Sequence, residues 1–220
     1  MKEILCNAEN YRKATNRKIK YLVIHYTAND GDTAQDNLKY FANHVVKASA
    51  HYFIDAQEVG RSVPEQDIAW HCGASSYRHP ECRNENSIGI ELCSRKNTNG
   101  TYEFAPQTVA RAVAFVRDCM VRYDIPVSHV LRHYDVTGKK CPAPFVDEPS
   151  AWKAFLAQLE EPEKRASEPP SGWASVAAAW AVEQGLFQGD QEGDYAWKEN
   201  LSRQALAVIL KRFAERYHLS

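Results

Sequence analysis

Apolar residues recur at two spacings along the first 160 positions, and these spacings predict strands and helices in alternation. The run at 20–25 is short, apolar and partly β-branched, as expected of a buried strand. The segment 87–92 alternates strictly, which places its apolar side chains on one face of a strand and its small or charged ones on the other. Similar patterns predict three more strands, at residues 51–55, 61–63 and 127–131.

Helical spacing is found in three segments of the same region. Thr33 is a candidate N-cap for a helix over about 33–47. The apolar face of this helix would consist of Leu38, Phe41, Ala42 and Val45. A second helix, opened by a proline, is expected over 106–123, and a short third one after Pro149. Together these elements predict a mixed α/β domain over residues 1–160.

A charged, proline-rich stretch at 161–171 follows this domain. It has no aliphatic side chain larger than alanine, so it cannot bury a core and is interpreted as a linker. Residues 172–220 then predict a small all-α module, with helices over about 173–184 and 202–217 around a glycine-containing turn. The chain is therefore expected to consist of one α/β domain, a linker and a small helical module.

Composition narrows the classes of function. The chain of 220 residues carries 27 basic and 28 acidic side chains, which argues against a nucleic-acid partner. No apolar run reaches the roughly 18 residues that span a bilayer, and the first residues show no signal peptide. We therefore expect a protein that is made in the cytoplasm, with any action outside the cell following release.

The spacing of the six cysteines shows no CxxC pair. If Cys141 binds a metal, five remain and at least one must be free, so the set fits a reduced compartment better than a secreted disulfide framework. Cys72 and Cys82 flank a polar loop, and the sequence leaves open whether they pair after release of the protein.

Two histidines and one cysteine form a candidate metal site. His25 closes the strand predicted at 20–25, and His133 and Cys141 lie eight residues apart, with a turn signal and two lysines between them. Two imidazoles and one thiolate are three ligands for zinc, and they leave the fourth tetrahedral position open, as in catalytic sites. Taken alone, a histidine such as His25 is more often a structural residue than a ligand. Metal binding is favoured only because His133 and Cys141 are also present.

Glu91 and Lys139 are candidate catalytic residues. In an extended segment Lys139 shares a face with Cys141, where its ammonium group would stabilise a developing oxyanion. Glu91 lies on the small-residue face of its strand, with room beside it for a substrate or a water whose proton it would take. The alternative for both is an ordinary solvent-exposed charge. His71 borders a polar loop and is a candidate for substrate contact, for a contact to a metal ligand, or for a structural role.

Five segments in order resemble the zinc-dependent N-acetylmuramoyl-L-alanine amidases, a family that includes phage lysozyme-type amidases, cell-wall recycling amidases and peptidoglycan recognition proteins. These segments are 23–28, 49–54, 69–73, 86–92 and 132–142. The resemblance covers roughly residues 18–160. It implies a mixed central β-sheet flanked by helices, with zinc in a groove on one face.

The resemblance also implies roles for individual residues. It implies zinc ligation by His25, His133 and Cys141, catalysis by Glu91 and Lys139, and substrate binding by His71 and Asn86. The implied reaction is hydrolysis of the amide between the lactyl group of N-acetylmuramic acid and L-alanine in peptidoglycan. Phage lysozyme-type members carry a catalytic tyrosine where this chain has Ala50, so the chain is more similar to the branch that uses a glutamate at position 91.

The helical module resembles a single S-layer-homology repeat in segments 180–189, 201–204 and 206–213. Such repeats usually bind wall polymers in sets of three, so one copy would bind the wall weakly, form a homodimer or pack on the enzyme. We expect an endolysin or autolysin that reaches the wall by holin-type release or lysis.

Two alternatives remain open. The first is a peptidoglycan-binding protein without catalysis, which the presence of Cys141 disfavours, since non-catalytic members have usually lost that ligand. The second is a cytosolic amidase that recycles soluble muropeptides, which the extra module disfavours, because a small soluble substrate needs no anchor.

Overall fold

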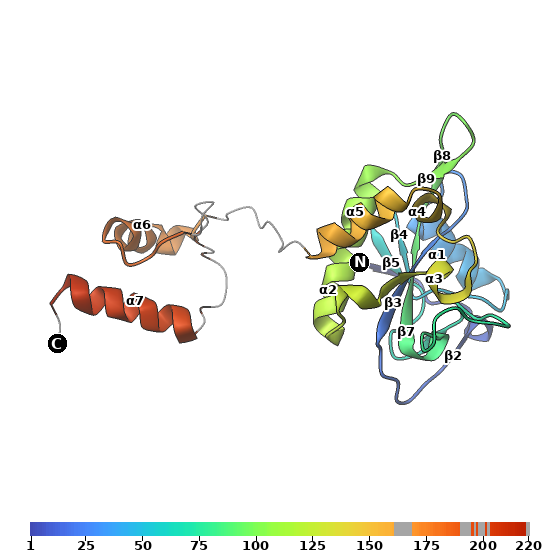
Figure 1. The fold of residues 1–220 in the computed structure, drawn as a ribbon, viewed down its shortest axis with the longest axis horizontal. Coiled ribbons are helices and arrows are strands. Elements are labelled where there is room, and N and C mark those ends of the chain that lie inside the picture. The colour runs from blue at the N-terminus through green and yellow to red at the C-terminus, as the bar shows by residue number, and fades with distance from the viewer. Residues whose placement is uncertain (161–168, 190–194, 196, 198–200, 202, 219–220) are drawn as a thin grey trace. The chain divides into compact units, whose positions relative to one another are not determined.

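In the computed structural model of the chain, a six-stranded mixed sheet forms the centre of residues 1–160 (Figure 1). The strand order across the sheet is β1 (Lys2–Glu3), β5 (Val59–Arg61), β4 (Tyr52–Ile54), β7 (Ser87–Leu92), β3 (Tyr21–Tyr26) and β10 (Val130–Arg132). Neighbouring strands are parallel except β4 and β5, which are antiparallel. Helices flank the sheet, so the predicted mixed sheet with flanking helices is confirmed.

The structure describes residues 1–160, 169–189, 195, 197, 201 and 203–218. Contacts divide the chain into two compact units, Met1–Pro162 and Glu163–Ser220. Most of the predicted linker, residues 161–168, lies outside the described residues.

In the two central strands, β7 and β3, successive side chains point alternately to the main core and to the opposite face of the sheet. The apolar side chains of β7 are fully buried in the main core, where they pack with α2 (Pro106–Tyr123) and α5 (Pro149–Glu160). In β3, Leu22 and Ile24 join this core, whereas Val23 belongs to a second cluster on the other face. His25 lies two residues after Val23 and therefore points away from the main core.

Helix α1 (Ala34–Asn43) begins as predicted, with a capping box between Thr33 and Asp36. Its predicted end near Lys47 is wrong, and Val45 lies outside the helix, 54% exposed. The cause is a distant side chain. The Asn10 amide donates to the backbone carbonyl of His44 at 2.6 Å, and its oxygen accepts from the backbone N–H groups of Val46 and Lys47. These bonds satisfy the backbone groups that would otherwise have continued the helix.

Two strand predictions are also corrected. The strand expected at 61–63 is β5 at Val59–Arg61, because the Asp55 carboxylate accepts from the backbone of Gln57 and Glu58 and so completes the preceding turn early. The strand expected over 127–131 begins only at Val130, since Val127–His129 forms a 3₁₀ turn after a proline.

Several short elements have no signal of their own in the sequence, because two to five residues do not establish a period. They are β2 (Tyr11–Arg12) paired with β6 (Ile68–Ala69), β8 (Arg95–Lys96) paired with β9 (Tyr102–Glu103), and the helices α3 (His133–Thr137) and α4 (Ala143–Asp147).

The second unit contains α6 (Ser175–Glu183) and α7 (Arg203–Arg216), within the two segments expected to be helical. The predicted cap residue Ser202 lies outside the described residues. Large apolar side chains of this unit are exposed, among them Trp173 at 91% and Val176 at 83%. In the part of the chain that the structure describes, no helix has the length and apolar character needed to cross a membrane.

Candidate active site

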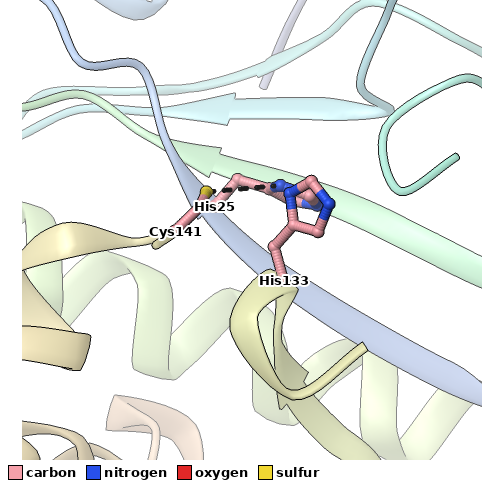
Figure 2. Close-up of side chains that lie close together, drawn as sticks. All are labelled: His25, His133 and Cys141. Atoms are coloured by element: carbon pink, nitrogen blue, oxygen red, sulfur yellow. Dashed lines mark hydrogen bonds between the residues drawn. The ribbon is translucent and has the colours of Figure 1, made fainter. Parts of the chain in front are cut away.

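The three candidate ligands come from strand β3 and from the segments that follow the adjacent strand β10 (Figure 2). His25 is the fifth residue of β3, and His133 begins α3 directly after β10. Because β10 pairs in parallel with β3, with Arg132 opposite Ile24, the residue that follows β10 emerges beside His25. Cys141 lies just before α4 and points toward the same place.

The ligand atoms of this trio fit a metal ion. One atom from each of His25, His133 and Cys141 lies within 4.8 Å of the others, and all three side chains are buried. The Sγ atom of Cys141 is 3.7 Å from Nδ1 of His25. Nδ1 of His133 is buried with no hydrogen-bond partner among the described residues, which costs about 1–3 kcal/mol unless something satisfies it. A cation among the three would do so, and the predicted trio is thus brought together.

Burial sets the protonation of the two histidines. It lowers the pKa of His25 well below its ordinary value, with a further contribution from the neighbouring His71. It lowers the pKa of His133 to about 4, helped by the charge of Lys139. Both imidazoles are therefore neutral near neutral pH, as metal ligands must be. Burial raises the pKa of the Cys141 thiol to about 12, and a metal ion is the kind of charge that deprotonates such a thiol.

Glu91 faces this trio from the adjacent strand. The β3–β7 register places it directly opposite His25, and its Oε1 lies 4.0 Å from Nδ1 of that histidine. Its other oxygen is buried without a hydrogen-bond partner in the described part of the chain. Burial raises the pKa of Glu91 to about 8, although Lys139 acts in the opposite direction. A carboxyl group with such a pKa exchanges protons efficiently near neutral pH.

The two lysines between the ligands differ in their surroundings. Lys140 forms an ion pair with Asp147 at 2.7 Å. Lys139 forms no ion pair among the described residues, and its charge acts on Glu91 and His133. The sequence predicts an extended segment at 139–141, but the backbone N–H of Cys141 donates to the carbonyl of Lys139 and closes a three-residue turn. Just before this turn, Gly138 ends α3 with a φ of 86°, a left-handed conformation that favours glycine and redirects the chain after the helix.

A cleft of about 790 Å³ opens over these residues and continues along α1. Its wall includes residues that the sequence argument did not single out, namely Asp32, Asp36, Asn37, Tyr40 and Trp70. Three of them come from α1, at positions 36, 37 and 40. Residues 36 and 40 are four apart and residues 37 and 40 are three apart, and this spacing on one side of a helix was the available signal.

The two residues assigned to substrate binding lie in different settings. His71 lines the cleft, but both its ring nitrogens are engaged within the protein. Asn86 lies in a 3₁₀ turn before β7, where its side chain accepts from the backbone of Arg83 and donates to the carbonyl of Glu81. It is not among the described residues that line the cleft. Substrate contact by either residue stays a prediction.

Comparison with known proteins gives a consistent picture. The family model of N-acetylmuramoyl-L-alanine amidases matches residues 15–144. The chain is 33% identical over 152 residues to the N-acetylmuramoyl-L-alanine amidase CwlL of Bacillus licheniformis, a match that covers 64% of the chain and 41% of CwlL. It is 30% identical over 204 residues to the amidase CwlA of Bacillus subtilis, covering 87% of the chain and 72% of CwlA.

Among solved structures, that of PlyL superposes with a TM-score of 0.61 at 26% identity, covering 73% of this chain and 97% of PlyL. The chain spans about two fifths of the length of the first curated relatives that it matches. The family match over more than half of its residues, with the fold and the buried trio, establishes its membership. The chain belongs to the N-acetylmuramoyl-L-alanine amidase family.

Proposed function

We propose that this protein is a zinc-dependent amidase that hydrolyses the bond between the lactyl group of N-acetylmuramic acid and L-alanine in peptidoglycan. The observation that carries the proposal is the buried trio of His25, His133 and Cys141, with Glu91 and Lys139 on the same cleft. Curated relatives that share the family are named N-acetylmuramoyl-L-alanine amidases.

The donor set favours zinc over other common cations. Two neutral imidazoles and a thiolate are the nitrogen and sulfur ligands that zinc takes, and calcium or magnesium prefers oxygen. The ion would be held by one nitrogen each of His25 and His133 and by Sγ of Cys141. When bound, zinc supplies Lewis-acid chemistry that activates water and polarises a carbonyl group.

The remaining chemistry is carried by two side chains. Glu91 takes a proton from the water that attacks the lactyl carbonyl carbon, and then delivers a proton to the amine of L-alanine as the amide bond breaks. Lys139 stabilises the negative charge that develops on the carbonyl oxygen. The cleft along α1 provides room for the substrate on either side of the reacting bond.

The proposal is tested by the products released from purified cell walls with and without a chelator. We expect loss of turbidity together with new L-alanine amino termini, and we expect the chelator to suppress both. Walls that pellet with the protein but yield no new amino termini would support peptidoglycan binding without catalysis. Cleavage of soluble muropeptides but not of intact walls would support a recycling amidase.

The adjacent lysines provide a matched pair of variants. Lys139→Met should lower kcat on a soluble muropeptide by about 10²–10³-fold, the usual effect of losing an oxyanion donor. Lys140→Met should leave kcat close to that of the unchanged protein, because its ammonium group pairs with Asp147. Equal rates in the two variants would remove Lys139 from the catalytic scheme.

We further propose that the second unit attaches the enzyme to the cell wall, where the protein acts after release from the cell. Support comes from the similarity of segments 180–189 and 206–213 to an S-layer-homology repeat. The exposed aromatic side chains of Trp173 and Trp180 offer contact surface for a wall polymer or for a second copy of the unit.

Deletion of residues 172–220 tests this attachment. We expect the shortened protein to cleave a soluble muropeptide at an unchanged rate, because the trio and the cleft lie within the first unit. We expect a smaller fraction of it to sediment with cell walls. Sedimentation equal to that of the full chain would show that the second unit is no anchor.

A further inference from the structure

A chain of hydrogen bonds lies behind the candidate metal site, on the side of His25 that faces away from Cys141. Nε2 of His25 is 3.0 Å from Nδ1 of His71, and Nε2 of His71 is 3.1 Å from the hydroxyl of Ser87. That hydroxyl in turn donates to the backbone carbonyl of Arg83 at 2.6 Å. Three bonds therefore connect the candidate ligand to a backbone oxygen.

The direction of these bonds follows from the protons available. A carbonyl oxygen can only accept, so the one hydroxyl proton of Ser87 is used on Arg83, and the Ser87 oxygen accepts from Nε2–H of His71. A neutral imidazole carries one proton, which leaves Nδ1 of His71 as an acceptor. The proton in the contact between the two imidazoles therefore belongs to Nε2 of His25.

With its proton on Nε2, His25 keeps a free lone pair on Nδ1, the nitrogen that lies 3.7 Å from Sγ of Cys141.

The position of His71 is built into the fold. Its ring packs on Gly89 so closely that a Cβ atom there would lie 2.4 Å from Cγ of His71, so glycine is needed at this position. The side-chain oxygen of Asn84 accepts the backbone N–H groups of His71 and Cys72. Ser87 is fully buried. Three contacts therefore fix the His71 ring: Asn84 binds its backbone, Gly89 packs on its face, and Ser87 accepts from its Nε2–H.

We propose that Ser87 and His71 act as positioning residues that hold His25 in its Nε2–H tautomer and so reserve Nδ1 for the metal. This inference rests on the proposed zinc site. Ser87 has no role in the proposed reaction, so this positioning role is new for it. For His71 the positioning role is added to the predicted substrate contact. Ligating histidines commonly donate their second ring N–H to an acceptor, and loss of such an acceptor typically weakens metal binding by about 10–100-fold.

Two matched pairs of variants of the full chain test whether these hydrogen bonds support metal binding. The affinity of each variant for zinc ion is measured by competition with a chromophoric chelator. Ser87→Thr keeps the hydroxyl, and Ser87→Val has the same shape without it. His71→Asn keeps an acceptor near the place of Nδ1, and His71→Leu has none. We expect S87V and H71L to bind zinc about 10–100-fold more weakly than S87T and H71N. The visible spectra of the cobalt forms should differ within each pair, whereas equal zinc affinities within both pairs overturn the proposal.

A measurement on the unchanged, metal-free chain needs no variant to fold. Nitrogen-15 NMR of the histidine rings at neutral pH should find the protons of His25 and His71 on Nε2. A proton on Nδ1 of His25 overturns the proposed positioning by His71 and Ser87. Failure of the proposed function gives a different result, because a chain that takes up no zinc contradicts the zinc site itself. Zinc uptake by a chain whose His25 carries its proton on Nδ1 contradicts only the positioning role.

Discussion

Replacing Cys141 by alanine is expected to abolish both zinc binding and amidase activity. The variant loses one of three protein ligands and leaves two neutral imidazoles, so zinc affinity should fall by more than the roughly 10–100-fold that follows loss of a mere hydrogen-bond partner of a ligand. Zinc content after dialysis and the rate on a soluble muropeptide measure the two losses. Cys141→Asp, which offers an oxygen ligand instead of sulfur, should retain more zinc than the alanine variant.

Cys119→Ala is the matched control for this experiment. Cys119 is buried like Cys141, but it lies in α2 within the main core and does not line the cleft. Its removal costs packing and should lower Tm without changing zinc content. A Cys141→Ala protein that keeps one zinc ion per chain and its full rate would be incompatible with the proposed site.

The second large effect is expected from Glu91→Gln. Glutamine keeps the shape of the side chain but cannot accept the proton of the attacking water, so kcat should fall by about 10²–10⁴-fold. Zinc content should stay near one per chain, because Glu91 is not one of the three ligands. Glu85→Gln, which alters an exposed carboxylate paired with Arg12, should leave kcat unchanged. An unchanged kcat in E91Q would show that Glu91 takes no part in catalysis.

Stability should change in the opposite direction to activity in this variant. Because burial raises the pKa of Glu91 from 4.5 to about 8, the folded state binds the proton more tightly than the unfolded state. The carboxyl therefore destabilises the fold increasingly as pH rises from about 4.5 to 8. Glutamine does not ionise, so chelator-treated E91Q should melt no lower than the unchanged protein at pH 8. A clearly lower Tm would mean that the carboxylate stabilises the fold.

Local spacing predicted those parts of the fold that a single segment controls. The alternation in 87–92 is enough to bury Ile88 and Ile90 and to send Glu91 to the other face, because side chains of a strand alternate whatever its neighbours are. The start of α1 was predictable for a similar reason, since its capping box involves residues only three apart. The end of α1 was not, because it depends on Asn10, which lies more than thirty residues earlier in the chain.

The candidate site shows the same division. The types and order of His25, His133 and Cys141 pointed to a zinc hydrolase, and the residue types of Glu91 and Lys139 suited acid–base and oxyanion chemistry. The sequence predicts an extended segment at 139–141, whereas the backbone N–H of Cys141 donates to the carbonyl of Lys139 and closes a tight turn there. The catalytic role of Lys139 stays a prediction.

The sequence by itself thus determined which residue types this protein offers for metal binding and proton transfer, and on which face of each strand they lie. Only the tertiary structure decided that these side chains meet. His25 and Cys141 are 116 positions apart, and His25 and His71 are 46 apart, so their contacts depend on the order of strands across the sheet. Spacing within one segment carries no information about that order, because it arises from pairing between segments that are distant along the chain.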